Sequence, residues 1–181
     1  MSSDDRRLAL MLRVIAILDM PARWVGKLTA WLIVPMILAL VYEVFFRYVL
    51  NEPTIWAYDI TYMLYAAMFM LGAAYALQTD SHVRADFLYN MLPVRYQAGI
   101  DAFFYILFFF PALAIFTWLT WHYAADSWQE LERIPTSPWM PPIYPLKSVM
   151  PATGILLLIQ GVSEVLKSLY MLITNERFRS Q

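Results

Sequence analysis

The sequence predicts an all-α membrane protein with four transmembrane helices and an N-terminal amphipathic helix at the membrane interface. Hydrophobic residues make up 61% of the 181 residues and charged residues 15%, whereas soluble domains have about 45–50% and about 25%. Four stretches of the chain reach the roughly 20 apolar residues that cross a bilayer. Too little charge remains to cover a water-exposed surface, so a soluble globular protein is excluded.

Composition excludes several classes of function. The net charge is -1, which leaves no basic surface for nucleic acid. The chain has no cysteine, so disulfides, thiolate metal sites and iron–sulfur clusters are absent. His82 lies just past the inner end of the second predicted span, and His122 lies at the outer end of the third. They would lie a membrane thickness apart and cannot ligate one haem. We expect no metal, no cofactor and no enzymatic activity.

Residues 1–27 are expected to form a cytoplasmic amphipathic segment. Apolar residues recur at helical spacing up to Leu18, and Pro21 follows them. We interpret this pattern as a helix in the membrane interface that turns its arginines toward anionic lipid headgroups and ends before Pro21. Packing against a partner protein is one alternative. A cleaved signal peptide is another, disfavoured because Arg13 interrupts the apolar region and no A-x-A-like site follows.

Residues 28–174 are expected to form a four-helix transmembrane domain, followed by a cytoplasmic tail at residues 175–181. The predicted spans cover approximately residues 28–48, 56–79, 100–125 and 148–174. We expect bends at Pro35 and Pro111, because neighbouring helices satisfy carbonyls that a proline frees inside a membrane.

The basic residues near the spans predict the orientation. Ten lie before span one, between spans two and three, or from Lys167 onward, whereas Arg47, Arg133 and Lys147 lie on the other side. Short cytoplasmic segments carry the excess of Lys and Arg. Both termini are therefore expected in the cytoplasm.

Charged and turn-forming residues gather where spans one and two connect. Glu43 and Arg47 are four apart in the order that favours a helical pair, and we expect Arg47 to pair with Asp59 across the turn. Three interpretations remain open: a cluster that fastens the hairpin, a contact with another subunit, or a path for protons or ions. The turn itself is predicted from residues that favour a reversal or anchor the returning helix at the interface, Asn51, Pro53 and Trp56.

Polar residues elsewhere predict further contacts. Glu164 and Lys167 are three apart and can pair, which indicates a structural pair, within the chain or with a partner helix, rather than a transport site. We expect a hydrogen bond between His82 and Asp86 that shapes the connection after span two, and we place His122 in the interfacial belt. The segment from Ser127 to Lys147 contains five of the 11 prolines, and is interpreted as a stiff spacer or a docking surface.

Two segments resemble a known family. The first is Phe46-Arg47-Tyr48-Val49-Leu50-Asn51-Glu52-Pro53-Thr54-Ile55-Trp56 with Asp59 after it. The second is Gly72-Ala73-Ala74-Tyr75-Ala76-Leu77 followed by His82-Val83-Arg84-Ala85-Asp86. In order, spacing and four-span layout they are similar to the small membrane subunit, or DctQ family, of tripartite ATP-independent periplasmic (TRAP) transporters.

The resemblance implies a subunit of a complex in the bacterial inner membrane. Its partners would be a large DctM-like membrane subunit that carries substrate by an elevator motion, a periplasmic DctP-like substrate-binding protein, and membrane lipids. Sodium would drive uptake of a carboxylate, and the small subunit would be a scaffold. Two alternatives remain open: a stand-alone proton-coupled exporter, and the membrane anchor of a redox complex.

Overall fold

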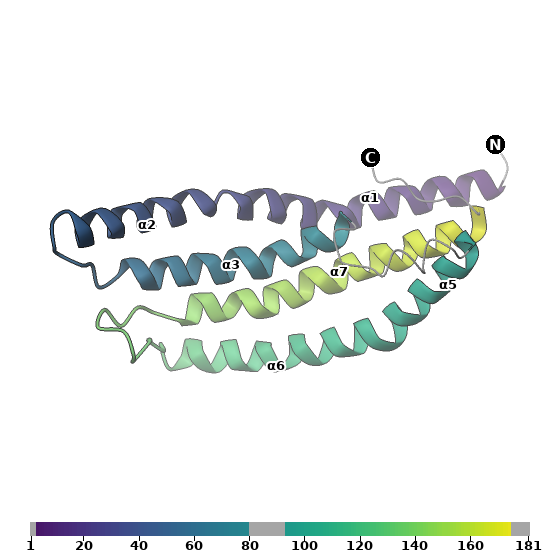
Figure 1. The fold of residues 1–181 in the computed structure, drawn as a ribbon. Coiled ribbons are helices and arrows are strands. Elements are labelled where there is room, and N and C mark those ends of the chain that lie inside the picture. Colours follow the sequence, from purple (N-terminus) through teal and green to yellow (C-terminus); the bar gives the residue numbers. More distant parts are fainter. Residues whose placement is uncertain (1–2, 80–92, 175–181) are drawn as a thin grey trace.

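The computed structural model describes residues 3–79 and 93–174, which form one elongated helical bundle (Figure 1). Helix α7 is central, since it contacts α1, α3, α5, η1 and α6, and α3 also contacts α1 and α2. The helices in chain order are α1 (Ser3–Ala30), α2 (Ile33–Tyr48), α3 (Ala57–Gln78), α5 (Val94–Phe104), the π-helix η1 (Tyr105–Phe109), α6 (Phe110–Gln129) and α7 (Tyr144–Thr174).

Four helical stretches are long and apolar enough to cross a membrane, as the sequence predicts. They are Leu8–Tyr48, Ala57–Gln78, Val94–Gln129 and Tyr144–Thr174, with 41, 22, 36 and 31 residues. Three of them exceed the roughly 20 residues that a bilayer requires. These three helices therefore tilt in the membrane or project beyond its hydrocarbon layer.

The described structure has no separate amphipathic helix at the N-terminus. Helix α1 contains Pro21 in its interior, so the prediction that the N-terminal helix ends before Pro21 is wrong. A proline inside a helix costs about 3 kcal/mol, but α1 packs against α3 and α7 on both sides of this residue. Ile15 and Ala22 are each only 2% exposed, and their burial offsets the cost.

The helical path is irregular before two of the intramembrane prolines. Between α1 and α2 the amides of Trp31, Leu32 and Val34 donate to carbonyls three residues earlier, at 3.0–3.2 Å. Pro35 follows directly and has no amide hydrogen to continue the α-helical pattern. The π-helix η1 likewise ends two residues before Pro111, and Figure 1 shows the helical rod curving between α6 and α5.

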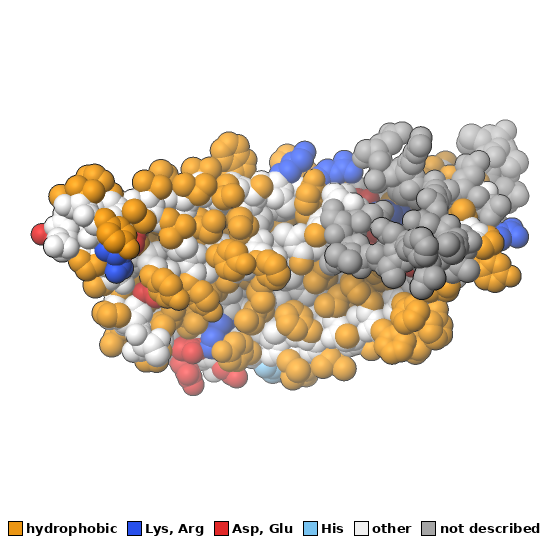
Figure 2. All heavy atoms as spheres, viewed as in Figure 1, with side chains coloured by type: hydrophobic (Ala, Val, Ile, Leu, Met, Phe, Trp, Pro, Cys, Tyr) orange, Lys and Arg blue, Asp and Glu red, His pale blue; other side chains and the backbone are white. Residues whose placement is uncertain are grey.

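The interior of the bundle is built from small and polar residues, and its surface from large apolar ones. Ala39, Ala57, Ala74, Ala98 and Ala124 are buried. Figure 2 shows hydrophobic side chains over most of the described surface on the side in view. Helices in lipid associate through small residues that allow close approach, because lipid supplies no hydrophobic driving force between them. The arrangement is therefore that of a membrane bundle.

Two glycines mark close crossings between helices. A Cβ added at Gly26 of α1 would lie 2.5 Å from the Cβ of Tyr75 on α3. A Cβ added at Gly154 of α7 would collide with Thr117 Oγ1 on α6. Real side chains do not approach so closely, so a larger residue at either position would require the facing side chain to move or to be replaced.

Candidate functional site

The connection between α2 and α3 is fastened by Glu43, which lies near the end of α2. Its Oε1 accepts a 2.8 Å hydrogen bond from Arg47 Nε and also pairs with Arg47 Nη2. Its Oε2 accepts a 3.0 Å hydrogen bond from the Thr54 amide and another from Thr54 Oγ1. The Glu43–Arg47 pair expected from the sequence is confirmed. Thr54, which the sequence analysis missed, ties this pair to the turn.

Asp59 does not pair with Arg47, so that prediction is wrong. Asp59 is 7% exposed and accepts a hydrogen bond from Ser137 Oγ, 78 residues later in the chain. The Arg47 guanidinium is occupied by Glu43, one helical turn away on its own helix. Asp59 therefore connects the start of α3 to the loop between α6 and α7, rather than to α2.

The other turn residues lie close to where the sequence places them. Asn51 has a φ of 60°, a left-handed conformation that asparagine tolerates better than most residues. Trp56 immediately precedes α3 and packs on Tyr42 of α2, with 5.4 Å between ring centroids. Pro53 is exposed in the connection. Together these residues form a compact reversal between two adjacent spans.

The proline-rich connection between α6 and α7 folds back on itself. The Ile134 amide donates to the Pro141 carbonyl and the Ile143 amide to the Glu132 carbonyl, each at 3.0 Å. We call residues 130–143 the clasp loop. Its base is held by an ion pair between Glu132 and Lys147, whose Nζ also lies 3.8 Å from the centroid of the Tyr123 ring.

This ion pair changes the titration of Glu132, which lies outside the membrane-spanning helices. The hydrogen bond from Lys147 lowers the pKa of the Glu132 carboxyl below its ordinary value of 4.5. Lys147 itself is 6% exposed. A buried ammonium needs an opposite charge, and Glu132 supplies it, so the clasp loop is anchored to α7 at neutral pH.

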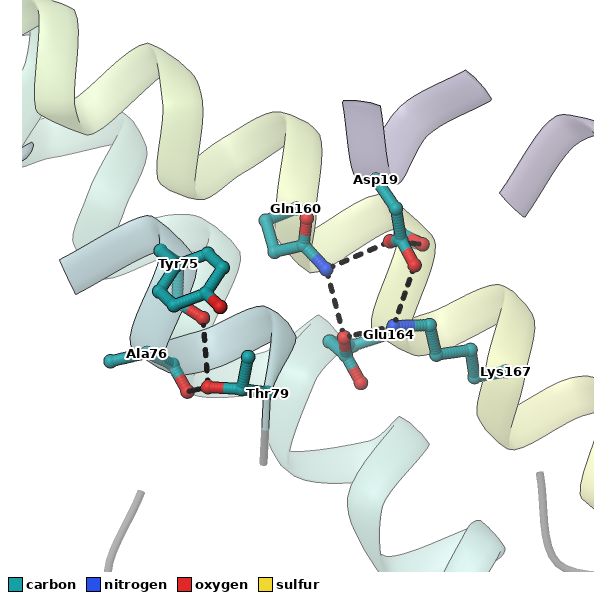
Figure 3. A network of polar contacts seen from close by, with 8 residues as sticks. Asp19, Tyr75, Ala76, Thr79, Gln160, Glu164 and Lys167 are labelled. Carbon is teal, nitrogen blue, oxygen red and sulfur yellow. Dashed lines mark hydrogen bonds and ion pairs between the residues drawn. The ribbon is translucent and has the colours of Figure 1, made fainter. Parts of the chain in front are cut away.

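A second polar cluster joins α1 to α7 (Figure 3). Lys167 Nζ lies 3.2 Å from Asp19 Oδ2 and 2.7 Å from Glu164 Oε1. Gln160 Nε2 donates to Asp19 Oδ1 at 3.0 Å and to Glu164 Oε1 at 2.9 Å. Ser163 Oγ donates to Asp19 Oδ1 at 2.6 Å. We call these five residues the α1–α7 cluster.

The α1–α7 cluster is buried and lies far from the hairpin end of the bundle. Its five residues are each at most 6% exposed. Glu164 is 20 residues after Tyr144, or about 30 Å along α7. The Glu164–Lys167 pair expected from the sequence is confirmed. Asp19 was missed, although its spacing from Ile15 and Ala22 continues the buried stripe of α1.

Of the two histidines, only His122 lies among the described residues. His122 on α6 is exposed; its Nδ1 lies 2.9 Å from the Trp118 carbonyl oxygen, and its ring packs on Trp118. His82 and Asp86, expected to hydrogen-bond to each other, lie outside the described residues. Among residues 3–79 and 93–174, no group of three or more His, Cys, Asp or Glu side chains is arranged to hold a metal ion.

The sequence is similar to a known family of membrane proteins. Residues 36–170 match the family model described as "Tripartite ATP-independent periplasmic transporters, DctQ component". The chain is 30% identical over 97 residues to the C4-dicarboxylate TRAP transporter small permease protein DctQ of Vibrio cholerae, covering 51% of this chain and 42% of the relative.

Two further relatives are named for sialic acid transport. The chain is 29% identical over 91 residues to the sialic acid TRAP transporter permease protein SiaT of Haemophilus influenzae, covering 48% of this chain and 15% of the relative. It is 26% identical over 73 residues to the small permease protein SiaQ of Vibrio cholerae, covering 40% of this chain and 42% of the relative. The matched regions thus span less than half of each relative.

Proposed function

Because the chain belongs to the DctQ component family of TRAP transporters, we propose that it is the immobile scaffold of such a transporter. Membership of this family makes it a small permease subunit and not an enzyme. In the proposal it braces a large DctM-like membrane subunit, which carries the substrate, and helps a periplasmic DctP-like substrate-binding protein to dock.

The observation that carries the scaffold role is that polar contacts fasten the bundle at both ends. At one end Glu43 holds the α2–α3 turn and Asp59 holds the clasp loop. About 30 Å along α7, the α1–α7 cluster ties α1 to α7 through Lys167 and Asp19. A subunit that moves against its own parts would break buried ion pairs, at a cost of several kcal/mol each. A rigid frame keeps them intact.

The substrate class is proposed from the relatives. One is named for C4-dicarboxylates and two for sialic acid, and both of these are organic acids. We propose that the whole complex, rather than this chain alone, takes up an organic acid with sodium as the driving ion. The substrate pathway then belongs to the large subunit, since each buried charged side chain of residues 3–79 and 93–174 has a partner within the chain.

The proposed orientation puts both termini and the connection between α3 and α5 in the cytoplasm of a bacterial cell. Ten basic residues flank the spans on that side and three on the other. The clasp loop then faces the periplasm, where the binding protein arrives. The α1–α7 cluster lies toward the cytoplasmic side and plays no part in that encounter.

The experiment is reconstitution. Purified chain alone in proteoliposomes is expected to transport nothing. Co-expression with the large subunit is expected to give a one-to-one complex, which takes up substrate when sodium and the loaded binding protein are added. Uptake by this chain alone would refute the scaffold role, and failure to bind any large permease would refute the partnership.

A further inference from the structure

One helix of the bundle presents an aromatic face that no described part of the chain covers. Tyr58, Tyr62, Tyr65 and Phe69 of α3 are 78%, 51%, 54% and 71% exposed. Their spacing of three or four residues places them in a single stripe along the helix. Tyr65 and Phe69 stack, with 6.3 Å between ring centroids. We call these four residues the tyrosine stripe.

The tyrosine stripe enters the apolar part of the membrane. Tyr65 is eight residues after Ala57, the first residue of α3, which corresponds to about 12 Å along the helix. Tyr58, in the first turn, can place its hydroxyl at the interface, where tyrosine is common. Tyr65 lies two turns deeper, and within the described chain its side chain contacts another ring but has no hydrogen-bond partner.

A hydrocarbon environment does not suit this hydroxyl. Lipid tails offer no hydrogen-bond acceptor, and an unsatisfied polar group there is costly. The exposed face of α2 at a similar distance from its end is mostly aliphatic, with Leu38 at 64% and Val41 at 61% exposure. Its tyrosine there, Tyr42, is 42% exposed and packs on two aromatic rings of its own chain. The tyrosine stripe therefore fits a protein surface that supplies acceptors better than it fits lipid.

The same face also leaves room for a second helix. Gly72 and Ala76 continue the stripe at the same spacing. Apart from its two chain neighbours and the backbone of its own helix turn, a Cβ added at Gly72 would have no atom within 4 Å. This glycine therefore does not serve packing inside the described chain. Two small residues four apart let helices approach closely in a membrane. Aromatic residues beside them supply contact area of the kind enriched at interfaces.

We propose that the tyrosine stripe, with Gly72 and Ala76, is the surface that receives a transmembrane helix of the large subunit. The partner helix presents a hydrogen-bond acceptor opposite Tyr65 and packs against Phe69 and Gly72. This inference rests on the proposed function, and it identifies which face of the small subunit meets its partner. The faces of α2 around Val41 and of α6 around Leu119 then contact lipid.

The first test substitutes Gly72, because the open space beside it spares the chain's own packing. Gly72→Leu fills the docking face and is expected to reduce co-purified large subunit at least tenfold, while the isolated chain keeps its melting temperature. Gly99→Leu is the matched control, since a Cβ at Gly99 also meets nothing within 4 Å. Wild-type assembly by Gly72→Leu would overturn the proposal.

The second test isolates the hydroxyl. Tyr65→Phe removes one oxygen atom and is expected to weaken assembly about threefold, the effect of a typical hydrogen bond between membrane helices. Tyr96→Phe, an exposed tyrosine of α5 outside the tyrosine stripe, is expected to leave assembly unchanged. Equal effects of the two variants would contradict an acceptor opposite Tyr65.

Photo-crosslinking of the intact complex then identifies the neighbour. A crosslinker at Phe69 is expected to capture the large subunit, whereas one at Val41 or at Leu119 is expected to capture lipid. A complex that forms but crosslinks through Val41 or Leu119 overturns this inference and leaves the proposed function standing. Capture of only a second copy of the chain at Phe69 also overturns it. A chain that assembles with no large permease instead refutes the proposed function.

Discussion

Lys167 of α7 forms an ion pair with Asp19 of α1, with 3.2 Å between Lys167 Nζ and Asp19 Oδ2, and both side chains are 7% exposed. Because Lys167 also holds Glu164, one ammonium group stabilises carboxylates on two helices. The pair fixes the middle of α1 against α7. The scaffold role is supported by this attachment, since it holds α1, which is part of the first long apolar stretch, against the central helix α7.

Removing the cation of this pair is expected to destabilise the chain strongly. Lys167→Met leaves the buried Asp19 carboxylate without an opposite charge, which costs roughly 3–5 kcal/mol. Thermal unfolding of the purified chain in detergent measures the loss. Adding Asp19→Asn to Lys167→Met is expected to recover part of it. Lys27→Met changes an exposed residue of α1 and serves as the control. If Lys167→Met destabilises the chain no more than Lys27→Met does, the role assigned to Lys167 is contradicted.

At the hairpin end, Thr54 is expected to matter more than Arg47. Thr54→Val removes the hydroxyl donor to Glu43 and costs about 1–3 kcal/mol, because a part-buried carboxylate loses a hydrogen bond. Arg47 is 50% exposed, and an exposed pair of this spacing contributes about 0.3–0.5 kcal/mol. Melting temperatures of Thr54→Val and Arg47→Ala compare the two. A larger loss for Arg47→Ala would reverse the assignment.

The pH dependence of the clasp loop follows from Glu132. Its pKa is lowered in the folded chain by Lys147, so its contribution to stability is present above the unfolded value near 4.5 and is lost as the pH falls through the lower folded value. The melting temperature of Glu132→Gln is expected to lie below wild type at pH 7. The difference should shrink as the pH is lowered past 4.5.

The matched control for this titration is Glu130→Gln. Glu130 is exposed two residues earlier in the same loop, and no described residue pairs with its side chain. Its melting difference from wild type is expected to be small and independent of pH. A Glu132→Gln difference that stays constant from pH 7 to pH 4 would show that the Lys147 pair does not anchor the loop.

Topology can be tested with single cysteines, because the chain has none of its own. A cysteine at Thr136 in the clasp loop is expected to react with a membrane-impermeant maleimide in intact cells. Cysteines at Ser3 and Ser81 are expected to react only after the cells are opened. Labelling of Ser81→Cys from outside would invert the orientation and would move the clasp loop away from the binding protein.

The sequence predicts those parts of the structure that depend on local spacing. Uncharged runs locate the four long helices, and spacings of four and three residues predict the pairs of Glu43 with Arg47 and of Glu164 with Lys167. Contacts between distant residues are not predictable in this way. Asp59 meets Ser137 78 residues later, and Asp19 meets Ser163 144 residues later, because the relative register of two packed helices decides these contacts.

The helix boundary at Pro21 shows a second limit. Local propensity predicts a stop, since proline removes a backbone hydrogen bond and collides with the preceding turn. Packing of α1 along α3 and α7 stabilises the continuous helix instead, with Ile15 and Ala22 nearly fully buried on either side. The sequence alone does not show which neighbours α1 will have, and so it does not show that the local cost is offset.

The central claim is that this chain does not move within itself while the transporter works, and a disulfide tests it most directly. A Cβ at Gly154 of α7 lies 3.2 Å from the Thr117 Cβ of α6, slightly below the separation of about 3.5–4.5 Å that a disulfide spans. The Thr117→Cys/Gly154→Cys chain, assembled with its partners in proteoliposomes, therefore locks α6 to α7 when oxidised. We predict equal sodium-driven uptake before and after reduction. Uptake that is lost on oxidation and restored by reduction would contradict the scaffold role.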